Sequence, residues 1–400
     1  MLYKIENDYL NLKIGIVVPF LFLSLIFLQC IVQIQFAPSI NSLIYICIFV
    51  VFFKKYKPFR KIVYSKSLCV WGVLILYHLV NASIKNVPEV DIADYLHGLK
   101  MFASISIFTF LLSVDMKKTL TFLIYSCVVW FSFALTTSGI HLRSEFNQGI
   151  NAITYGKIAT CMAIYTMYLG MLNYSSMVKV CIKCTIPFIV VLAAQTRNSF
   201  AMIVFQLIGY YYGISLKAKI RLKNMLMLFL LAVILYYGID YILHYTELGN
   251  RFLDQDDVVQ SQINNGIYTN SIWGKILGER LSYYVYGFQL FLANPLTGIG
   301  YNNYQYVTGG DYPMHPEYML HVCEGGIVAI VFFSLFVLEI LKIIIKAKIS
   351  QSVRVMLFAT FGAIMFSHLY ATMFDQELIV ILYCLILSVN QSYSILRKNK

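Results

Sequence analysis

Four arginines offer the clearest chemistry in the stretches that we expect outside the cytoplasm: Arg143, Arg197, Arg251 and Arg280. Arg197 stands in AAQTRNSFAM between two short apolar segments, and Arg280 opens GERLSYY. A guanidinium at the edge of a bilayer is costly unless it reaches the lipid headgroups or finds a partner. Either these side chains are anchors or ion pairs, or they form a fixed anion site, because the planar guanidinium can hold a diphosphate through two hydrogen bonds.

Arg143 is the weaker candidate, because it lies in the polar stretch HLRSEFNQGIN with Asn147 and Asn151. On its own, an arginine in such a loop is typical of a solvated surface. Arg143 is a candidate substrate-binding residue only through the family resemblance described below.

The segment NPLTGIGYNNY offers a second kind of candidate, a tight turn that brings backbone amides close to a partner. It holds Gly298, Gly300, Tyr301 and Asn303 shortly after Pro295. The GxGxxN spacing resembles a dinucleotide fingerprint, but that motif needs a preceding strand in a βαβ unit, and none is visible. We therefore interpret the segment as a turn whose residues are candidates for contact with substrate.

His315 is the candidate active-site histidine, in DYPMHPEYMLHVCEGG. A lone loop histidine is usually a surface hydrogen-bonding residue, but neighbouring prolines stiffen this segment. His321 and Glu324 follow within one to two turns, close to the next membrane helix. The group is therefore expected where the headgroup of a lipid-linked substrate would lie. Glu317 is a further candidate for contact with the substrate.

Composition indicates which solvent surrounds these candidates. Of 400 residues, 59% are hydrophobic and 12% are charged, whereas a soluble protein carries roughly 25% charged residues. The formal net charge of +12 comes from short basic clusters between apolar runs. That pattern is typical of cytoplasmic membrane loops. We expect an all-α, multi-pass integral membrane protein with no nucleic acid partner.

Apolar runs long enough to cross a bilayer, about 20 residues each, divide the chain into about twelve spans. They are expected at roughly 14–34, 38–53, 67–84, 97–114, 119–139, 157–174, 181–196, 199–216, 225–244, 324–345, 353–373 and 377–395. Every second connection is basic, beginning with the cluster from Lys54 to Lys66. Because Lys and Arg are retained in the cytoplasm, both termini are expected there.

The segment 245–323 is too long for an ordinary connection, since loops beyond about 15 residues are usually functional or disordered. Its acidic residues outnumber its basic ones, seven to three, which suits the outer side. Its stretch LSYYVYGFQLFLANPL predicts an amphipathic helix ending at Asn294-Pro295. We expect three parts: spanning helices in 1–244, one large outer loop in 245–323, and spanning helices in 324–400.

No metal or cofactor is expected from the cysteines. Most of the nine lie inside apolar runs, where cysteine behaves as a small hydrophobic residue. Cys181 and Cys184 form an isolated CxxC, whereas a structural zinc site usually needs four ligands.

These motifs resemble the O-antigen polymerase/ligase superfamily, membrane enzymes that act on polyprenyl-diphosphate-linked glycans. The resemblance is strongest from Arg280 to about Val331, where an arginine-led helix runs into NPLTGIGYNNY and His-x-x-Tyr-x-Leu runs into EGGI. HLRSEFNQGINAITYGKIA and QTRNSFAM are similar to the family's arginine-bearing outer segments. The family's histidine is commonly followed by asparagine, whereas Pro316 stands here.

The resemblance implies a GT-C-like fold in a bacterial cytoplasmic (inner) membrane, with the large loop on the periplasmic side. It implies Arg197 and Arg280 as ligands of the lipid diphosphate and His315 beside them. An acceptor sugar hydroxyl would then attack the anomeric carbon of the donor, with inversion and without a metal, while the arginines stabilise the departing diphosphate. The base would be His315, Glu317 or Asp311.

Three functions stay open at this point. A polysaccharide polymerase, for O-antigen, capsule or exopolysaccharide, would join repeat units on the lipid carrier. A ligase would move the finished glycan to a lipid or core acceptor, and the outer tyrosines would suit either. A transporter or flippase would need ionisable residues near the midplane of the membrane, and these residues are almost absent. Membrane lipid and polyprenyl-diphosphate-linked oligosaccharide are the expected partners, and a chain-length regulator protein stays open.

Overall fold

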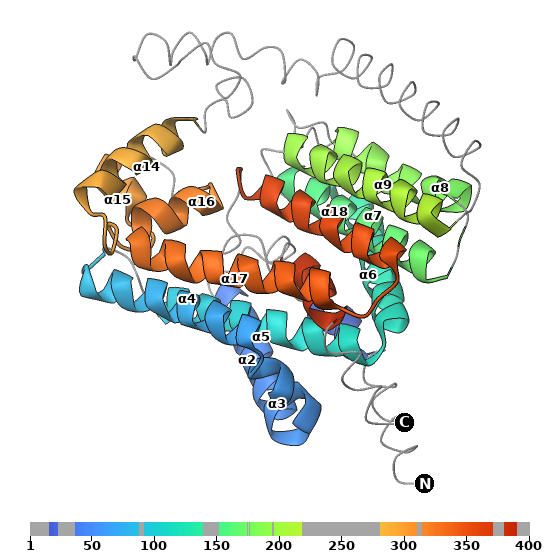
Figure 1. Ribbon diagram of the computed structural model, residues 1–400, viewed down its shortest axis with the longest axis horizontal. Helices are drawn as coiled ribbons and strands as arrows, with labels where there is room; N and C mark the ends of the chain where they lie inside the picture. Colours follow the sequence, from blue (N-terminus) through green and yellow to red (C-terminus); the bar gives the residue numbers. More distant parts are fainter. Residues whose placement is uncertain are drawn as a thin grey trace.

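The computed structural model describes residues 16–22, 37–87, 92–138, 152–173, 175, 177–193, 196–217, 281–309, 314–370 and 380–389. Over these residues the chain is helical and contains no β-strand, as Figure 1 shows. The all-α class expected from the sequence is therefore confirmed for the described part of the chain.

The labelled helices follow one another along the chain, and residues 218–280, between α9 and α14, lie outside the described part. They are α2 (Ala37–Lys55), α3 (Lys57–Val63), α4 (Lys66–Ile84), α5 (Ile92–Val114), α6 (Met116–Ser138), α7 (Ala152–Leu172), α8 (Met177–Ala193), α9 (Arg197–Lys217), α14 (Leu281–Ala293), α15 (Tyr304–Thr308), α16 (Glu317–Met319), the π-helix η3 (Leu320–Glu324), α17 (Gly326–Lys346) and α18 (Gln351–Ser367). A further helix spans Val380–Val389.

Helices α4 and α17 form a long antiparallel pair (Figure 1). Near the middle, the rings of Trp71 and Phe336 lie 5.1 Å apart. At one end, Nζ of Lys66 lies 3.1 Å from a carboxylate oxygen of Glu339. The pairing therefore brings the end of α4 and the beginning of α17 together at the opposite end, where the site is built.

Helix α9 packs between α18 and α7. A Cβ atom placed on Gly209 would lie 2.2 Å from Cβ of Ala359, so the missing side chain allows the two helices to approach closely. Behind this contact Tyr168, Thr360 and Gln206 form a buried chain of hydrogen bonds of 2.7 and 3.0 Å. Small residues and shared polar groups are the usual means of association for helices surrounded by lipid.

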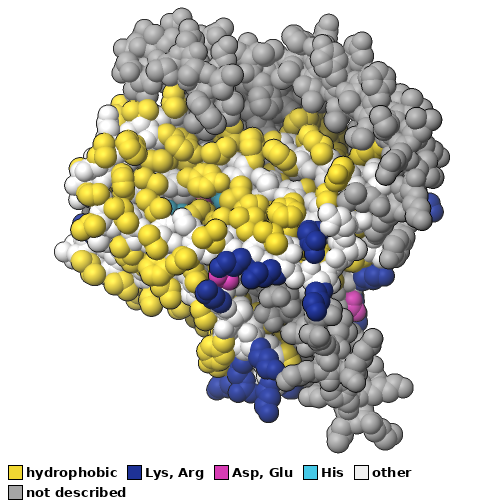
Figure 2. All heavy atoms as spheres, in the orientation of Figure 1, with side chains coloured by type: hydrophobic (Ala, Val, Ile, Leu, Met, Phe, Trp, Pro, Cys, Tyr) yellow, Lys and Arg dark blue, Asp and Glu magenta, His cyan; other side chains and the backbone are white. Residues whose placement is uncertain are grey.

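Three of the described helices are long and apolar enough to cross a membrane: Lys66–Ile84, Asp94–Val114 and Gly326–Lys346. The shorter helices Gln351–Ser367 and Val380–Val389 are also apolar. Figure 2 shows apolar side chains covering much of the visible face. A soluble monomer rarely exposes so large an apolar surface, so these helices identify a membrane protein.

The expected spans 38–53, 67–84, 97–114 and 324–345 coincide with α2, α4, α5 and α17. The segment 225–244 and most of 14–34 lie outside the described residues, as does 245–280 of the expected outer loop. The number of spans and the outer loop therefore stay predictions.

The connection that was expected between the second and third spans contains a helix that the sequence analysis did not predict. Helix α3 has a proline in its first turn, and its own side chains Phe59, Ile62 and Val63 are buried. Dark blue side chains gather near this end of the molecule in Figure 2. Lys66 and Lys342 both contact Glu339, so basic residues far apart in sequence share one end. Which side of the membrane this end faces stays a prediction.

Candidate functional site

The candidate site lies at the head of α17, where the turn 294–303 wraps around η3. The backbone amides of Ile299 and Gly300 donate to the carbonyls of Cys323 and Glu324, each over 3.0 Å. In the other direction the amide of Ile327 donates to the carbonyl of Pro295 over 2.9 Å. These bonds run both ways between the two segments, so the turn and the head of the helix form one rigid unit.

Two glycines make this close approach possible. Gly298 has φ of +66° and Gly300 has φ of +101°, both in the region that disfavours side chains. A Cβ atom on Gly298 would lie 2.4 Å from the carbonyl carbon of Glu324. The sequence analysis predicted a tight turn here, and the structure shows that its partner is the backbone of η3.

The carboxylate of Glu324 occupies the inside of the turn. It accepts hydrogen bonds from the amides of Asn302, over 2.8 Å, and Tyr304, over 3.2 Å. Asn302 itself has φ of 61°, and the side-chain amide of Asn303 donates to the carbonyl of Ile299 over 2.8 Å. The backbone amides that were expected to approach a partner therefore meet a buried carboxylate of the same chain.

The end of α4 contributes three residues that the sequence analysis did not single out. The hydroxyl of Tyr77 donates to the carbonyl of Gly325 over 2.7 Å. The side-chain amide of Asn81 donates to the carbonyls of Thr297, over 2.8 Å, and Glu324, over 3.1 Å. His78 completes the set. A signal was present, because His78 and Asn81 lie three residues apart on one helical face of an apolar span, where polar side chains usually face the protein interior.

His78, His321 and Glu317 form a buried chain of side chains. Nε2 of His78 lies 2.9 Å from Nδ1 of His321, and Nε2 of His321 lies 2.9 Å from a carboxylate oxygen of Glu317. The three residues are 0%, 1% and 0% exposed. Burial lowers the pKa of His321 to about 3, so its ring is neutral. A neutral imidazole has one donor nitrogen and one acceptor nitrogen, so His321 can donate to one of its two neighbours and accept from the other.

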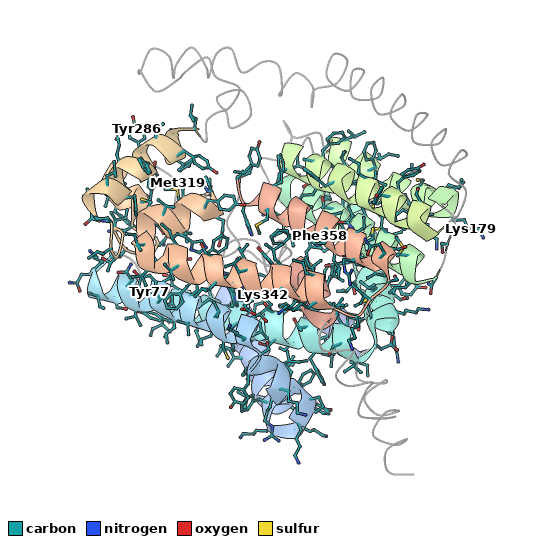
Figure 3. The ribbon with its side chains drawn as sticks, in the orientation of Figure 1. Tyr77, Lys179, Tyr286, Met319, Lys342 and Phe358 are labelled. Carbon is teal, nitrogen blue, oxygen red and sulfur yellow. The ribbon has the colours of Figure 1, made fainter. Side chains whose placement is uncertain are left out.

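His315 lies two residues before Glu317, on the surface of the same unit. It is half-buried, and its ring centroid lies 5.7 Å from that of Tyr283 on α14. Tyr283 in turn lies 5.4 Å from Tyr304, and Tyr301 lies 5.7 Å from His78. Tyr77, Tyr286 and Met319 all lie at this end of the α4–α17 pair in Figure 3. The ring of Tyr283 therefore lies beside the candidate histidine, and that of Tyr304 lies beyond it.

Hydrogen bonds connect this unit to the helices on its other side. The amide of Glu317 donates to the carbonyl of His368 over 3.0 Å, and the hydroxyl of Tyr284 donates to the carbonyl of Leu369 over 3.1 Å. Next to His368, Oγ of Ser367 accepts from the side-chain amide of Asn198 over 2.9 Å. The beginning of α9 therefore lies at the same end of the molecule as the segment that carries His315.

The residues predicted for the site fall into three groups. The structure brings His315 and Glu317 together with the turn residues Gly298, Gly300, Tyr301 and Asn303. The backbone of Arg197 begins α9 beside Asn198. Arg143, Arg280 and Asp311 lie outside the described residues, although Arg280 immediately precedes α14. The roles assigned to these residues in catalysis and binding stay predictions.

Among the described residues no cluster of three or more His, Cys, Asp or Glu side chains could hold a metal ion.

Residues 184–334 match the family model described as O-antigen ligase. No curated protein matches the chain significantly. The matched range contains α9, the turn, the His315 segment and the head of α17, whereas His78 lies outside it. Members of this family are glycosyltransferase-like enzymes that act on lipid-linked oligosaccharides. This match confirms the resemblance to the O-antigen polymerase/ligase superfamily that the sequence predicted.

Proposed function

We propose that the protein is a membrane glycosyltransferase that extends a polysaccharide. It would transfer glycan from a polyprenyl-diphosphate donor to the acceptor sugar of a second lipid-linked repeat unit, on the outer face of the cytoplasmic membrane. One observation carries the proposal: His315, inside the family-matched range, lies beside Tyr283 on a unit that is hydrogen-bonded toward the beginning of α9, where Arg197 stands.

The proposed reaction is a direct displacement. The acceptor hydroxyl oxygen forms a bond to the anomeric carbon of the donor, and the bond from that carbon to the diphosphate oxygen breaks. Polyprenyl diphosphate leaves with the electron pair, and the proton of the hydroxyl passes to a base, for which His315 is the candidate. Arg197 and Arg280 would stabilise the negative charge that grows on the leaving group.

The reaction would invert the anomeric centre, because the hydroxyl attacks from the side opposite the diphosphate. A metal is not needed in this scheme, since fixed guanidinium groups supply the positive charge. Tyr283 beside His315, and Tyr304 next to Tyr283, have the flat apolar faces and polar edges that suit sugar rings. Activity that survives a chelator would agree with this scheme, whereas restoration by added divalent cations would contradict it.

Glycan analysis of a deletion strain tests the proposed step in the cell. Loss of only the longer chains, with single repeat units still reaching the surface, is the result expected for a polymerase. Full-length chains that accumulate on the lipid carrier, together with single units, would instead indicate a ligase, because a ligase acts after the chains are complete. Restoration of long chains by the intact gene, and not by a variant lacking Arg280, serves as the control.

A transporter is the second candidate, and one observation favours it. Lys100 is fully buried in α5, within a helix that is apolar and long enough to span a membrane. Ionisable residues at such positions often mark transport pathways, and the sequence analysis did not single out Lys100. Loss of every surface repeat unit in the deletion strain would favour this function.

A further inference from the structure

We propose that His78 is a positioning residue for His315, acting through His321 and Glu317. This inference rests on the proposed function, because it matters for catalysis only if His315 takes part in glycan transfer. It assigns a role to a residue of α4 that lies outside the family-matched range 184–334.

The segment that carries His315 leads into α16, which packs against η3 and α14. Helix α16 has three residues and no side-chain cap at its N-terminus. Pro316 restricts the backbone between His315 and Glu317. Glu317 has two contacts that fix its position. Its backbone amide donates to the carbonyl of His368, and its carboxylate lies against Nε2 of His321. The orientation of Glu317 therefore determines where the backbone of His315 lies.

His321 can hold the carboxylate only in one ring orientation, and His78 is the residue that holds this orientation. A neutral imidazole has one donor and one acceptor nitrogen. When Nε2 carries the proton toward the carboxylate oxygen of Glu317, 2.9 Å away, Nδ1 is the acceptor, and Nε2 of His78 lies 2.9 Å from it. The two rings also lie close, with centroids 5.1 Å apart. A histidine–carboxylate pair oriented by a third group is a common arrangement in enzyme sites.

The same burial argues for positioning and against proton transfer to bulk water. All three side chains are at most 1% exposed, so a proton on this chain could not exchange readily with solvent. Side-chain hydrogen bonds from Asn81 to the carbonyl of Thr297 in the turn and from Tyr77 to the carbonyl of Gly325 fix α4 against the same unit. His78 is thus attached to a helix whose position relative to the turn is already set.

Substitutions at position 78 separate a hydrogen-bond donor from a proton carrier. His78→Gln keeps an N–H donor near the position of Nε2, His78→Asn places its amide too close to the backbone, and His78→Ala has none. Leu79→Ala is the matched control, since Leu79 is the next residue on α4 and is 5% exposed. It does not belong to the row of side chains His78, His321 and Glu317. Each variant is purified and its folded fraction is measured first.

The first measurement does not depend on activity. His315→Cys is combined with each substitution, and labelling by a water-soluble maleimide is compared with the parent that retains only the natural cysteines. We expect His78→Ala and His78→Asn to change the labelling rate of position 315 severalfold. His78→Gln and Leu79→Ala should leave the labelling rate unchanged.

The second measurement is transfer of glycan between lipid-linked repeat units, with His315 intact. We expect kcat to fall roughly 10- to 100-fold in His78→Ala, with little change in KM, because small misplacements of a reacting group have effects of this size. His78→Gln should retain most activity. Equal loss in His78→Gln and His78→Ala, or labelling unaffected by His78→Ala, would overturn the proposal. A wild-type protein that transfers no glycan would refute the proposed function instead, and the labelling rates would still judge the positioning role.

Discussion

His321 shows how a single buried residue can make the fold sensitive to acid. Burial lowers the pKa of His321 in the folded protein to about 3, against an ordinary value of 6.5. Below pH 6.5 the unfolded chain therefore binds a proton that the folded chain does not. Stability is lost progressively as the pH falls from about 6.5 toward about 3, by about 2 kcal/mol at pH 5 relative to pH 7.5.

Thermal unfolding of the detergent-purified protein at pH 7.5 and pH 5.0 tests this effect. We expect the melting temperature of the wild type to fall between the two values. In His321→Gln, which cannot bind the proton, the fall should be smaller. An equal fall in both proteins would mean that His321 is not buried in a neutral form.

Arg197 and Arg280 carry the electrostatic part of the proposed mechanism. We expect Arg197→Ala or Arg280→Ala to reduce chain extension by about 100- to 1,000-fold, the typical effect of removing one fixed group that stabilises transition-state charge. Protein level and membrane insertion should stay normal. Arg354→Ala is the control, because Arg354 donates to the carbonyl of Ala347 at the head of α18, at the opposite end. Wild-type glycan ladders from both site variants would contradict the proposed diphosphate site.

At this scale the sequence predicted the site only in part. His315, Glu317 and the glycines of the turn could be recognised because they lie within about 20 residues of one another. The contributions of Tyr77, His78 and Asn81 could not be derived in the same way. Their partners lie more than 200 positions away in the chain, and only the antiparallel pairing of α4 with α17 brings them together.

Gly298 shows that the turn and α17 act as one element. Gly298→Ala would add both backbone strain and a contact of 2.4 Å with the backbone of Glu324. Gly309→Ala is the matched control, because Gly309 also has a positive φ, of +65°, but has no atom within 4 Å of the added Cβ. Gly309→Ala should lower the free energy of unfolding only by the backbone strain, about 1–2 kcal/mol.

We therefore expect Gly298→Ala to reduce the yield of folded protein and to abolish chain extension in what remains. Gly309→Ala should retain both. Folded protein can be measured by size-exclusion chromatography in detergent, and extension by glycan length. Similar behaviour of the two variants would show that the turn can move away from η3 without loss of the site.

Among the elements, long apolar helices were the easiest to predict. Length and hydrophobicity locate α4, α5 and α17 to within a few residues, and the proline of Asn294-Pro295 correctly ends α14. The π-helix η3 was not predicted. Its carbonyls at Cys323 and Glu324 face the turn, so its shape depends on a tertiary contact. Helix α3 was also missed, because a seven-residue helix is too short for a periodic pattern.

For the whole molecule, the two ends of the helix pair have different chemistry. Lys66 and Lys342 meet at Glu339 at one end, and the turn, His315 and the aromatic side chains lie at the other. This separation agrees with the predicted topology, in which basic loops stay in the cytoplasm and the site faces outward.

The most direct measurement of the proposed function counts bonds made and leaving groups released. Purified protein in lipid vesicles is mixed with polyprenyl-diphosphate-linked repeat units, and free polyprenyl diphosphate is compared with new glycosidic bonds. We predict one polyprenyl diphosphate released for each bond formed, with growing chains that stay on the lipid carrier. Release without new bonds, or repeat units that cross the membrane without lengthening, would contradict the account.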